Sequence, residues 1–156
     1  MSENHANVLV RPPNLYLGGL VAGCLLELVL PLGPGLAGGT LRPVIIGLGL
    51  AAIGIAIVWK AIRQFADAGA TIQVDEPTDA LVTHGLYSWS RNPIYIALTL
   101  IYVGLSIALT TGWALLFLPL VLGVMQKGVI EREEAYLSRE FGEPYMDYSD
   151  RVPRWL

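Results

Sequence analysis

Four nearly uncharged apolar runs constrain what this sequence can fold into. They cover residues 15–31, 43–59, 93–109 and 112–129. An α-helix needs roughly 17–25 mostly apolar residues to cross the hydrocarbon core of a bilayer, and each run is close to that length. Only 15% of the chain is charged, whereas soluble domains carry about 25%. The sequence therefore predicts an all-α fold, in which residues 1–156 form one membrane domain: a four-helix bundle with a C-terminal cytoplasmic interfacial helix and tail.

Positive charge is divided unequally between the two ends of this predicted bundle. Only Arg42 belongs to one end, and the other nine Lys and Arg residues belong to the other. Cytoplasmic segments of membrane proteins carry an excess of Lys and Arg, so both termini and the segment between the second and third runs are predicted to be cytoplasmic. The net charge of −3 gives no indication of a nucleic-acid partner. The nine residues are Arg11, Lys60, Arg63, Arg91, Lys127, Arg132, Arg139, Arg151 and Arg154.

Small residues recur inside the first two runs. Gly19 and Gly23 form a small-xxx-small pattern, which lets two helices approach closely. We expect this face to pack within the bundle, with homodimerisation as the lesser alternative. The sequence GLGLAA at residues 47–52 resembles part of a dinucleotide-binding fingerprint, but that fingerprint needs a preceding strand and an opening helix. Here the glycines lie inside an apolar helix, so a packing role is predicted.

Glu27 is the one acid inside the first run. An acid within a membrane span is costly and is by default a functional hypothesis. However, Glu27 lies only four residues before Pro31. We therefore expect its side chain to reach the headgroups at the far side of the membrane.

The polar stretch LVTHGLYSWSRNPIY, residues 81–95, stands between two apolar runs. Gly85 permits a turn that a residue with a Cβ would resist. Pro93 suits the first turn of the following helix, so Arg91 and Asn92 are expected at its N-terminus, where backbone N–H groups favour anions. This pattern indicates a functional site, and the alternative is a loop with an interfacial aromatic belt. Residues 69–79 are expected to form a loop over the cytoplasmic mouth of the bundle.

The last part of the chain, residues 130–156, is predicted to be a cytoplasmic helix and a lid. Ile130, Leu137 and Phe141 form one narrow apolar stripe at helical spacing. Glu133 and Glu134 flank this stripe, and two inward carboxylates are costly unless they meet cations. The alternative is a pair of surface acids bonded to Arg91 or Lys127. Gly142 is expected to end the helix, and the aromatic tail is expected to fold back. The residues expected to point away are Arg132, Ala135, Tyr136 and Arg139.

Two stretches carry a resemblance to a known family: residues 81–95, and EREEAYLSREFGEPYMDYSDRVPRWL at residues 131–156. Together they resemble the isoprenylcysteine carboxyl methyltransferase and phospholipid N-methyltransferase superfamily, in a bacterial branch. The resemblance covers about half of the chain, and it implies an integral membrane enzyme that uses S-adenosyl-L-methionine. It also implies a lipophilic or lipid acceptor at the cytoplasmic face of the membrane. For the bacterial branch, this membrane is expected to be the bacterial inner membrane. No metal site is expected.

The chemistry of methyl transfer from this cofactor also suggests roles for particular residues. Arg91 is expected to orient a carboxylate of the acceptor or of the cofactor. Glu134 or His84 is expected to remove a proton if the acceptor is an amine or a thiol. The cofactor's ammonium and sulfonium groups would be complemented by carboxylates and tyrosine rings. The implied cofactor-binding residues are Leu81, Val82, Gly85, Tyr87, Asn92, Pro93, Tyr95, Glu133 and Glu134.

This sequence departs from the family pattern at two positions. Asn92 stands where the eukaryotic enzymes have His, although a bacterial branch carries Asn. Val129 stands where the prenylcysteine enzymes have an Arg implicated in holding the substrate carboxylate. Two rival functions stay open: a membrane oxidoreductase of the sterol-reductase type that uses NADPH, and a non-catalytic membrane adaptor.

Overall fold

The computed structural model describes residues 8–32, 40–69 and 80–156. Within these residues the chain is helical and contains no strand, so the all-α prediction is confirmed. A 3₁₀ turn covers Gly85–Ser88, and a π-helical turn covers Gln126–Ile130. Of the loop expected at residues 69–79, all but Gly69 lies outside the described residues. The helices are α1 (Pro12–Val29), α2 (Leu41–Asp67), α3 (Pro93–Ala108), α4 (Gly112–Met125), α5 (Glu131–Phe141) and α6 (Glu143–Arg151).

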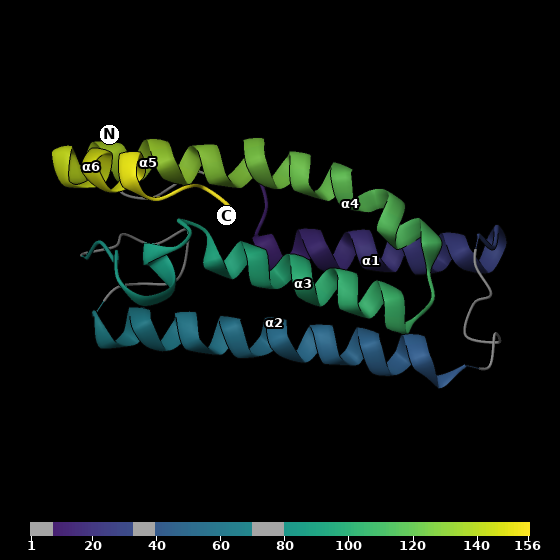
Figure 1. The fold of residues 1–156 in the computed structure, drawn as a ribbon. Helices are drawn as coiled ribbons and strands as arrows, with labels where there is room; N and C mark the ends of the chain where they lie inside the picture. The colour runs from purple at the N-terminus through teal and green to yellow at the C-terminus, as the bar shows by residue number, and fades with distance from the viewer. Residues whose placement is uncertain (1–7, 33–39, 70–79) are drawn as a thin grey trace.

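Three of the described helices are long and apolar enough to cross a membrane. They are α1, α2 and the continuous helical run Gly112–Phe141, which joins α4, the π turn and α5. The third predicted run corresponds to α3, which is apolar but has 16 residues. The second predicted run is longer than expected, because α2 continues to Asp67 and includes the polar residues around Arg63. Figure 1 shows α4 and α5 as one long rod along the molecule.

Small residues bring the helices together in two close pairs, α2 with α3 and α1 with α4. A Cβ on Gly47 would lie 2.4 Å from the carbonyl oxygen of Gly104, and one on Gly23 would lie 2.5 Å from the backbone nitrogen of Ala114. These distances are too short for any side chain, so only glycine permits the approach. The predicted packing role is confirmed for Gly19, Gly23 and Gly47, whereas a Cβ on Gly49 would meet nothing within 4 Å.

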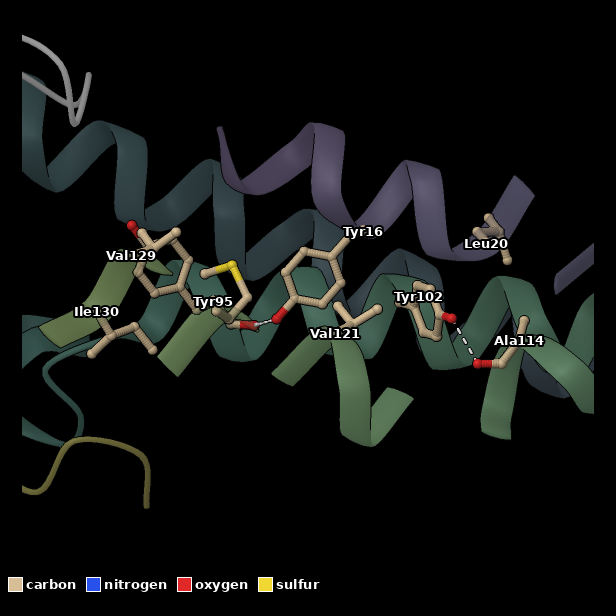
Figure 2. Packing of buried hydrophobic residues seen from close by; sticks show 9 residues of the cluster. Tyr16, Leu20, Tyr95, Tyr102, Ala114, Val121, Val129 and Ile130 are labelled. Carbon is tan, nitrogen blue, oxygen red and sulfur yellow. Dashed lines mark hydrogen bonds between the residues drawn. The ribbon is translucent and has the colours of Figure 1, made fainter. Parts of the chain in front are cut away.

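The main core lies where α1, α3 and α4 meet and continues along the helical rod (Figure 2). Tyr102 donates a hydrogen bond of 2.6 Å to the carbonyl oxygen of Ala114. The hydroxyl groups of Tyr16 and Thr99 lie 2.8 Å apart and share a hydrogen bond. Buried hydroxyl groups are costly without partners, so these bonds let tyrosines serve as large core residues. The buried members of the cluster are Tyr16, Leu20, Tyr95, Tyr102, Ala114, Val121, Met125, Val129 and Ile130.

Glu27 does not reach the headgroups, so that expectation is wrong. The residue is buried, and its Oε2 accepts hydrogen bonds from the backbone nitrogens of Gly112 at 2.8 Å and Trp113 at 3.4 Å. Its Oε1 accepts from the backbone nitrogen of Leu32 at 2.7 Å. A carboxylate is stabilised at a helix N-terminus by unpaired N–H groups and by the helix dipole. Glu27 therefore ties the end of α1 to the beginning of α4.

Candidate functional site

The turn before α3 is held against α2 by one side chain. Gly85 has a φ of +63°, a conformation that favours glycine, and this confirms the predicted turn. The Nε2 atom of Gln64 donates to the carbonyl oxygen of His84 at 3.3 Å, and its Oε1 accepts from the backbone nitrogen of Leu86 at 3.1 Å. A Cβ at residue 85 would collide with the Gln64 amide. Glycine at this position therefore leaves room for the Gln64 amide to make both hydrogen bonds to the turn.

The turn also forms a small apolar cluster with α2. Val82 and Tyr87 are buried against Ala61, with Phe65 beside them. The rings of Tyr87 and Phe65 meet edge to face, with centroids 5.2 Å apart. Burial raises the pKa of Tyr87 well above its usual value, so its phenol stays neutral. Tyr87 can therefore present a ring or a donor to a ligand, but it is unsuited to act as a base.

Asn92 is the N-cap residue of α3 and Pro93 is in its first turn, as predicted. Three hydrogen bonds join this segment to the chain after α6. The backbone nitrogen of Arg91 donates to the carbonyl oxygen of Pro153 at 2.9 Å. Ser90 Oγ and Asn92 Nδ2 both donate to the carbonyl oxygen of Arg154, at 3.1 and 3.0 Å. The chain after α6 therefore lies against the segment before α3.

Aromatic residues of α6 close the same region. Tyr145 and Tyr148 are buried, and their rings meet edge to face with centroids 6.2 Å apart. The hydroxyl group of Tyr148 donates to the carbonyl oxygen of Tyr87 at 2.8 Å. Gly142, with a φ of +58°, ends α5 and lets α6 turn back. In Figure 1 the 3₁₀ turn, α5 and α6 gather at one end of the molecule.

The two adjacent glutamates of α5 have different partners. Tyr95 donates a hydrogen bond of 2.6 Å to Oε1 of Glu133. Glu134 instead meets two guanidinium groups: Arg91 Nη1 lies 3.3 Å from its Oε1, and Arg154 binds both of its oxygens, at 2.8 and 2.5 Å. Hydrogen bonding to Glu134 raises the pKa of Arg154. The alternative of an acid bonded to Arg91 thus holds for Glu134, while Glu133 faces a tyrosine.

The Arg91 side chain contacts Glu134 and Tyr145, yet its Nε donor has no protein partner in the described part of the chain. Its side chain is mostly buried, with 15% exposure, and its Nε has no hydrogen-bond partner within the described residues. A buried donor of this kind is costly unless something accepts from it. A ligand carboxylate fits this donor, and a ligand cation fits Glu133. The residues present are therefore compatible with a cofactor that carries both charges, such as S-adenosyl-L-methionine.

Most predicted site residues converge on this end of the molecule, and His84 lies in the same turn without a side-chain contact to them among the described residues. Arg91, Tyr95, Glu133 and Glu134 are joined by the contacts above. His84 is exposed, and its recorded contact uses its backbone carbonyl. Leu81 is half-buried beside Val82. Nothing in these contacts assigns a catalytic role to His84.

The predicted orientation of α5 is wrong at one residue. Tyr136 was expected to point away from the core, yet its exposure is only 5%. The apolar stripe that predicted this orientation is narrow, and Leu137 and Phe141 at its far end are only half-buried. Tyr136 lies outside this stripe, but burying a large aromatic side chain is strongly favourable. Glu131 is exposed, in agreement with the helical spacing.

Sequence reasoning did not single out three residues that organise the site. Gln64 holds the turn, Ser90 holds the tail, and Arg154 pairs with Glu134. In the sequence, Arg154 stands out only as one of nine basic residues at the predicted cytoplasmic end. Its partner is 20 residues away, so no local spacing identifies the pair. A polar Gln near the end of an apolar helix was the only available signal for Gln64.

A groove of about 600 Å³ lies between α3 and α4, beside this cluster. Ligand sites in proteins usually have volumes of about 300–1,000 Å³. The groove is lined by apolar residues together with Thr99 and Gln126, and no charged side chain lines it. Because α3 pairs mainly with α2, and α4 with α1, the two helices leave space between them. The lining residues are Ile96, Thr99, Leu100, Leu122, Gly123, Gln126, Trp155 and Leu156.

Comparison with known proteins agrees with the resemblance seen in the sequence. A family model described as phospholipid methyltransferase matches residues 43–144, well over half of the chain. The protein-S-isoprenylcysteine O-methyltransferase of Mus musculus is 34% identical over 79 residues, 51% of this chain and 28% of that protein. The enzyme of the same name from Schizosaccharomyces pombe is 36% identical over 73 residues, 47% of this chain and 31% of that protein.

A shorter protein matches along its whole length. The Haemophilus influenzae protein, whose name gives no function, is 35% identical over 63 residues, 40% of this chain and 100% of its own length. The two named methyltransferases match over less than a third of their length. The family model covers α3, α4, α5 and most of α2, and the three long apolar helices are those of a membrane protein. The chain belongs to the phospholipid methyltransferase family of integral membrane proteins.

Proposed function

We propose that this protein transfers a methyl group from S-adenosyl-L-methionine to a lipophilic acceptor at the cytoplasmic face of the membrane. One observation carries the proposal: the turn before α3, the carboxylates of α5 and the aromatic tail meet beside an uncharged groove. A charged cofactor needs a site with charged side chains, and a lipophilic acceptor needs an apolar site next to it. Family membership supports the methyltransferase class.

The cofactor is proposed to bind at the charged cluster. Glu133 would hold a cation, and the unpartnered Nε of Arg91 would hold a carboxylate. Tyr87 and Tyr95 would supply rings or donors. The resemblance adds the remaining proposed contacts, which are Leu81, Val82, Gly85, Asn92, Pro93 and Glu134.

The acceptor's hydrocarbon part is proposed to lie in the groove between α3 and α4. Both helices are apolar, so the groove would be reached sideways from the lipid. Its lining contains no charged side chain, which favours an uncharged chain. Val129, on the π turn, is fully buried. It offers no cation for a substrate carboxylate at the position where the prenylcysteine enzymes have an Arg.

The cofactor would supply an activated methyl group, and the protein's part is orientation and exclusion of water. Arg91 is proposed to orient a carboxylate, held in place by Glu134. Glu134 and His84 are the proposed bases if the acceptor must lose a proton. Glu134 would first have to release Arg154, because Arg91 and Arg154 contact both of its carboxylate oxygens.

The proposal includes four membrane spans, with α3 as the third. The shortness of α3 is compatible with this, because the polar residues before it would lie at the membrane surface. Both termini would then be cytoplasmic in a bacterial inner membrane. The small-residue face of α1 is already used by α4, so a homodimer through that face has no support.

Calorimetric titration of the detergent-purified protein tests this function. S-adenosyl-L-methionine and S-adenosylhomocysteine should both bind with saturable heats, and NADPH should not. NADPH binding in place of the other two would favour the oxidoreductase. A protein that binds none of the three would favour the non-catalytic adaptor.

A further inference from the structure

We propose that Ser90 is a positioning residue for the acceptor, because it fixes the main chain that brings Trp155 into the wall of the groove. Trp155 is then a specificity-determining residue. This inference rests on the proposed function and deepens it. The family resemblance implies a role for neither residue.

The first step is the anchoring of one carbonyl group. Ser90 has an exposure of 2%. Its hydroxyl donates to the carbonyl oxygen of Arg154 at 3.1 Å and accepts from the backbone nitrogen of Asn92 at 3.1 Å. Asn92 Nδ2 donates to the same carbonyl at 3.0 Å. That carbonyl is part of the peptide bond between Arg154 and Trp155. The side chains of Ser90 and Asn92 therefore fix the position of the Trp155 main chain.

The second step is the change of environment along the same short segment. The side chain of Arg154 contacts Glu134 in the charged cluster. The next two residues, Trp155 and Leu156, line the groove. Residues 153–156 therefore form a shared wall between the cofactor cluster and the acceptor groove. A displacement of residues 153–156 would change the shape of the groove and leave the position of Glu133 unchanged.

The third step is the chemistry of the occupant. Apart from Trp155 and Leu156, the groove residues belong to α3, α4 and the π turn, which are parts of continuous helices. Trp155 is the one aromatic ring among them, and a tryptophan offers 150–250 Å² of contact area, roughly, on burial. A neutral hydrocarbon chain matches this uncharged lining. Residues 153–156 connect the groove directly with the charged cluster. We therefore assign the hydrocarbon chain in the groove to the methyl acceptor.

Photolabelling tests the assignment. The protein is placed in lipid nanodiscs with a long-chain alcohol that carries a diazirine, and labelled peptides are mapped by mass spectrometry. Label on α3 and α4 is expressed relative to label on the exposed face of α2 around Ile45 and Leu48. Ser90→Ala and Trp155→Ala should each lower this ratio by about threefold or more. Ser90→Thr, which keeps the hydroxyl, should restore it.

Ser88→Ala is the matched control. Its hydroxyl is exposed and donates only within its own turn, to the carbonyl oxygen of Gly85 at 2.8 Å, so the label ratio should not change. S-adenosylhomocysteine affinity, measured by calorimetry, should be the same in Ser90→Ala and in the wild type. A general loss of structure would lower both affinity and labelling.

Three results would overturn the assignment. The first is an equal label ratio in Ser90→Ala and Ser88→Ala. The second is an equal loss of labelling and of S-adenosylhomocysteine affinity in Ser90→Ala, with Trp155→Ala unchanged. The third is wild-type label spread evenly over the groove and the α2 face, which would mean that ordinary lipid fills the groove. If the wild type binds no S-adenosylhomocysteine, the proposed function fails, while the labelling comparison still decides the role of Ser90.

Discussion

The two glutamates of α5 show how one residue of separation changes a chemical environment. Successive residues on a helix are rotated by about 100°, so Glu133 and Glu134 face different neighbours. Glu133 accepts from Tyr95, whereas Glu134 is neutralised by Arg91 and Arg154. Glu134 therefore organises the arginines. Glu133, which has no cation partner among these contacts, is the better candidate for binding a positively charged ligand.

Replacing Glu133 with Gln should weaken S-adenosyl-L-methionine binding strongly. Loss of a charge that faces a ligand cation in a partly dry pocket costs roughly 2–5 kcal/mol, which is a weakening of about thirtyfold or more. Glu131→Gln is the control, because Glu131 is exposed and accepts from Gln126 at 3.2 Å. Calorimetry measures both variants. Equal, small effects at the two positions would remove Glu133 from the site.

Gly85→Ala should lower thermal stability more than Gly69→Ala. Both glycines have a positive φ, +63° and +66°, so each alanine has a backbone cost of about 1–2 kcal/mol. Only at residue 85 would the new Cβ also meet Gln64; at residue 69 it meets nothing within 4 Å. A thiol-reactive dye can follow unfolding through Cys24, the single cysteine. Equal losses would show that the Gln64 contact is not needed.

At the scale of elements, apolar runs and turn residues predicted most of the helices. The runs predicted the positions of α1 to α4, Pro93 predicted the start of α3, and Gly142 predicted the end of α5. The pairing of helices was not predictable, because glycine spacing shows which faces are narrow but not which helix lies opposite. The role of Glu27 was not predictable for the same reason, because its partners at residues 112 and 113 lie in another helix.

The candidate site was predictable only in part. Its residue types followed from motifs, and Arg91, Tyr95 and the glutamates do meet. The contacts of Arg154, Ser90 and Gln64 join segments 20 or more residues apart. Such contacts depend on tertiary packing, which a single sequence pattern does not specify.

Gly23→Ala should weaken the packing of α1 against α4. Its Cβ would lie 2.5 Å from the Ala114 backbone, whereas a Cβ on Gly18 would meet nothing within 4 Å. Overpacking of this kind costs about 1–3 kcal/mol, while Gly18→Ala in a helix should be neutral or stabilising by up to about 1 kcal/mol. The same Cys24 unfolding assay measures the difference. Identical stabilities in the two variants would contradict the described α1–α4 contact.

At the scale of the whole molecule, the candidate site residues lie at one end of the helices. The turn before α3, α5, α6 and the segment after it lie there (Figure 1). The opposite end holds the Glu27 cap and the α3–α4 connection. Basic residues are concentrated at the first end, so the proposed site should face the cytoplasm.

Cysteine labelling tests this orientation. In a Cys24→Ser background, Leu32→Cys and Ser88→Cys place single thiols at exposed positions near opposite ends. A membrane-impermeant maleimide applied to intact cells should label residue 32 at once and residue 88 only after permeabilisation. The reverse labelling pattern would mean that the protein has the opposite orientation in the membrane, with the site outside the cytoplasm.

The central claim is methyl transfer to a lipophilic acceptor. Membranes that contain the protein are incubated with S-adenosyl-L-methionine labelled with tritium in the methyl group, and the lipids are then extracted into organic solvent. The wild type should place radioactivity in the organic phase, well above membranes without the protein, and Glu133→Gln should remove most of that excess. No excess with the wild type, under conditions in which calorimetry shows the cofactor bound, would contradict the account.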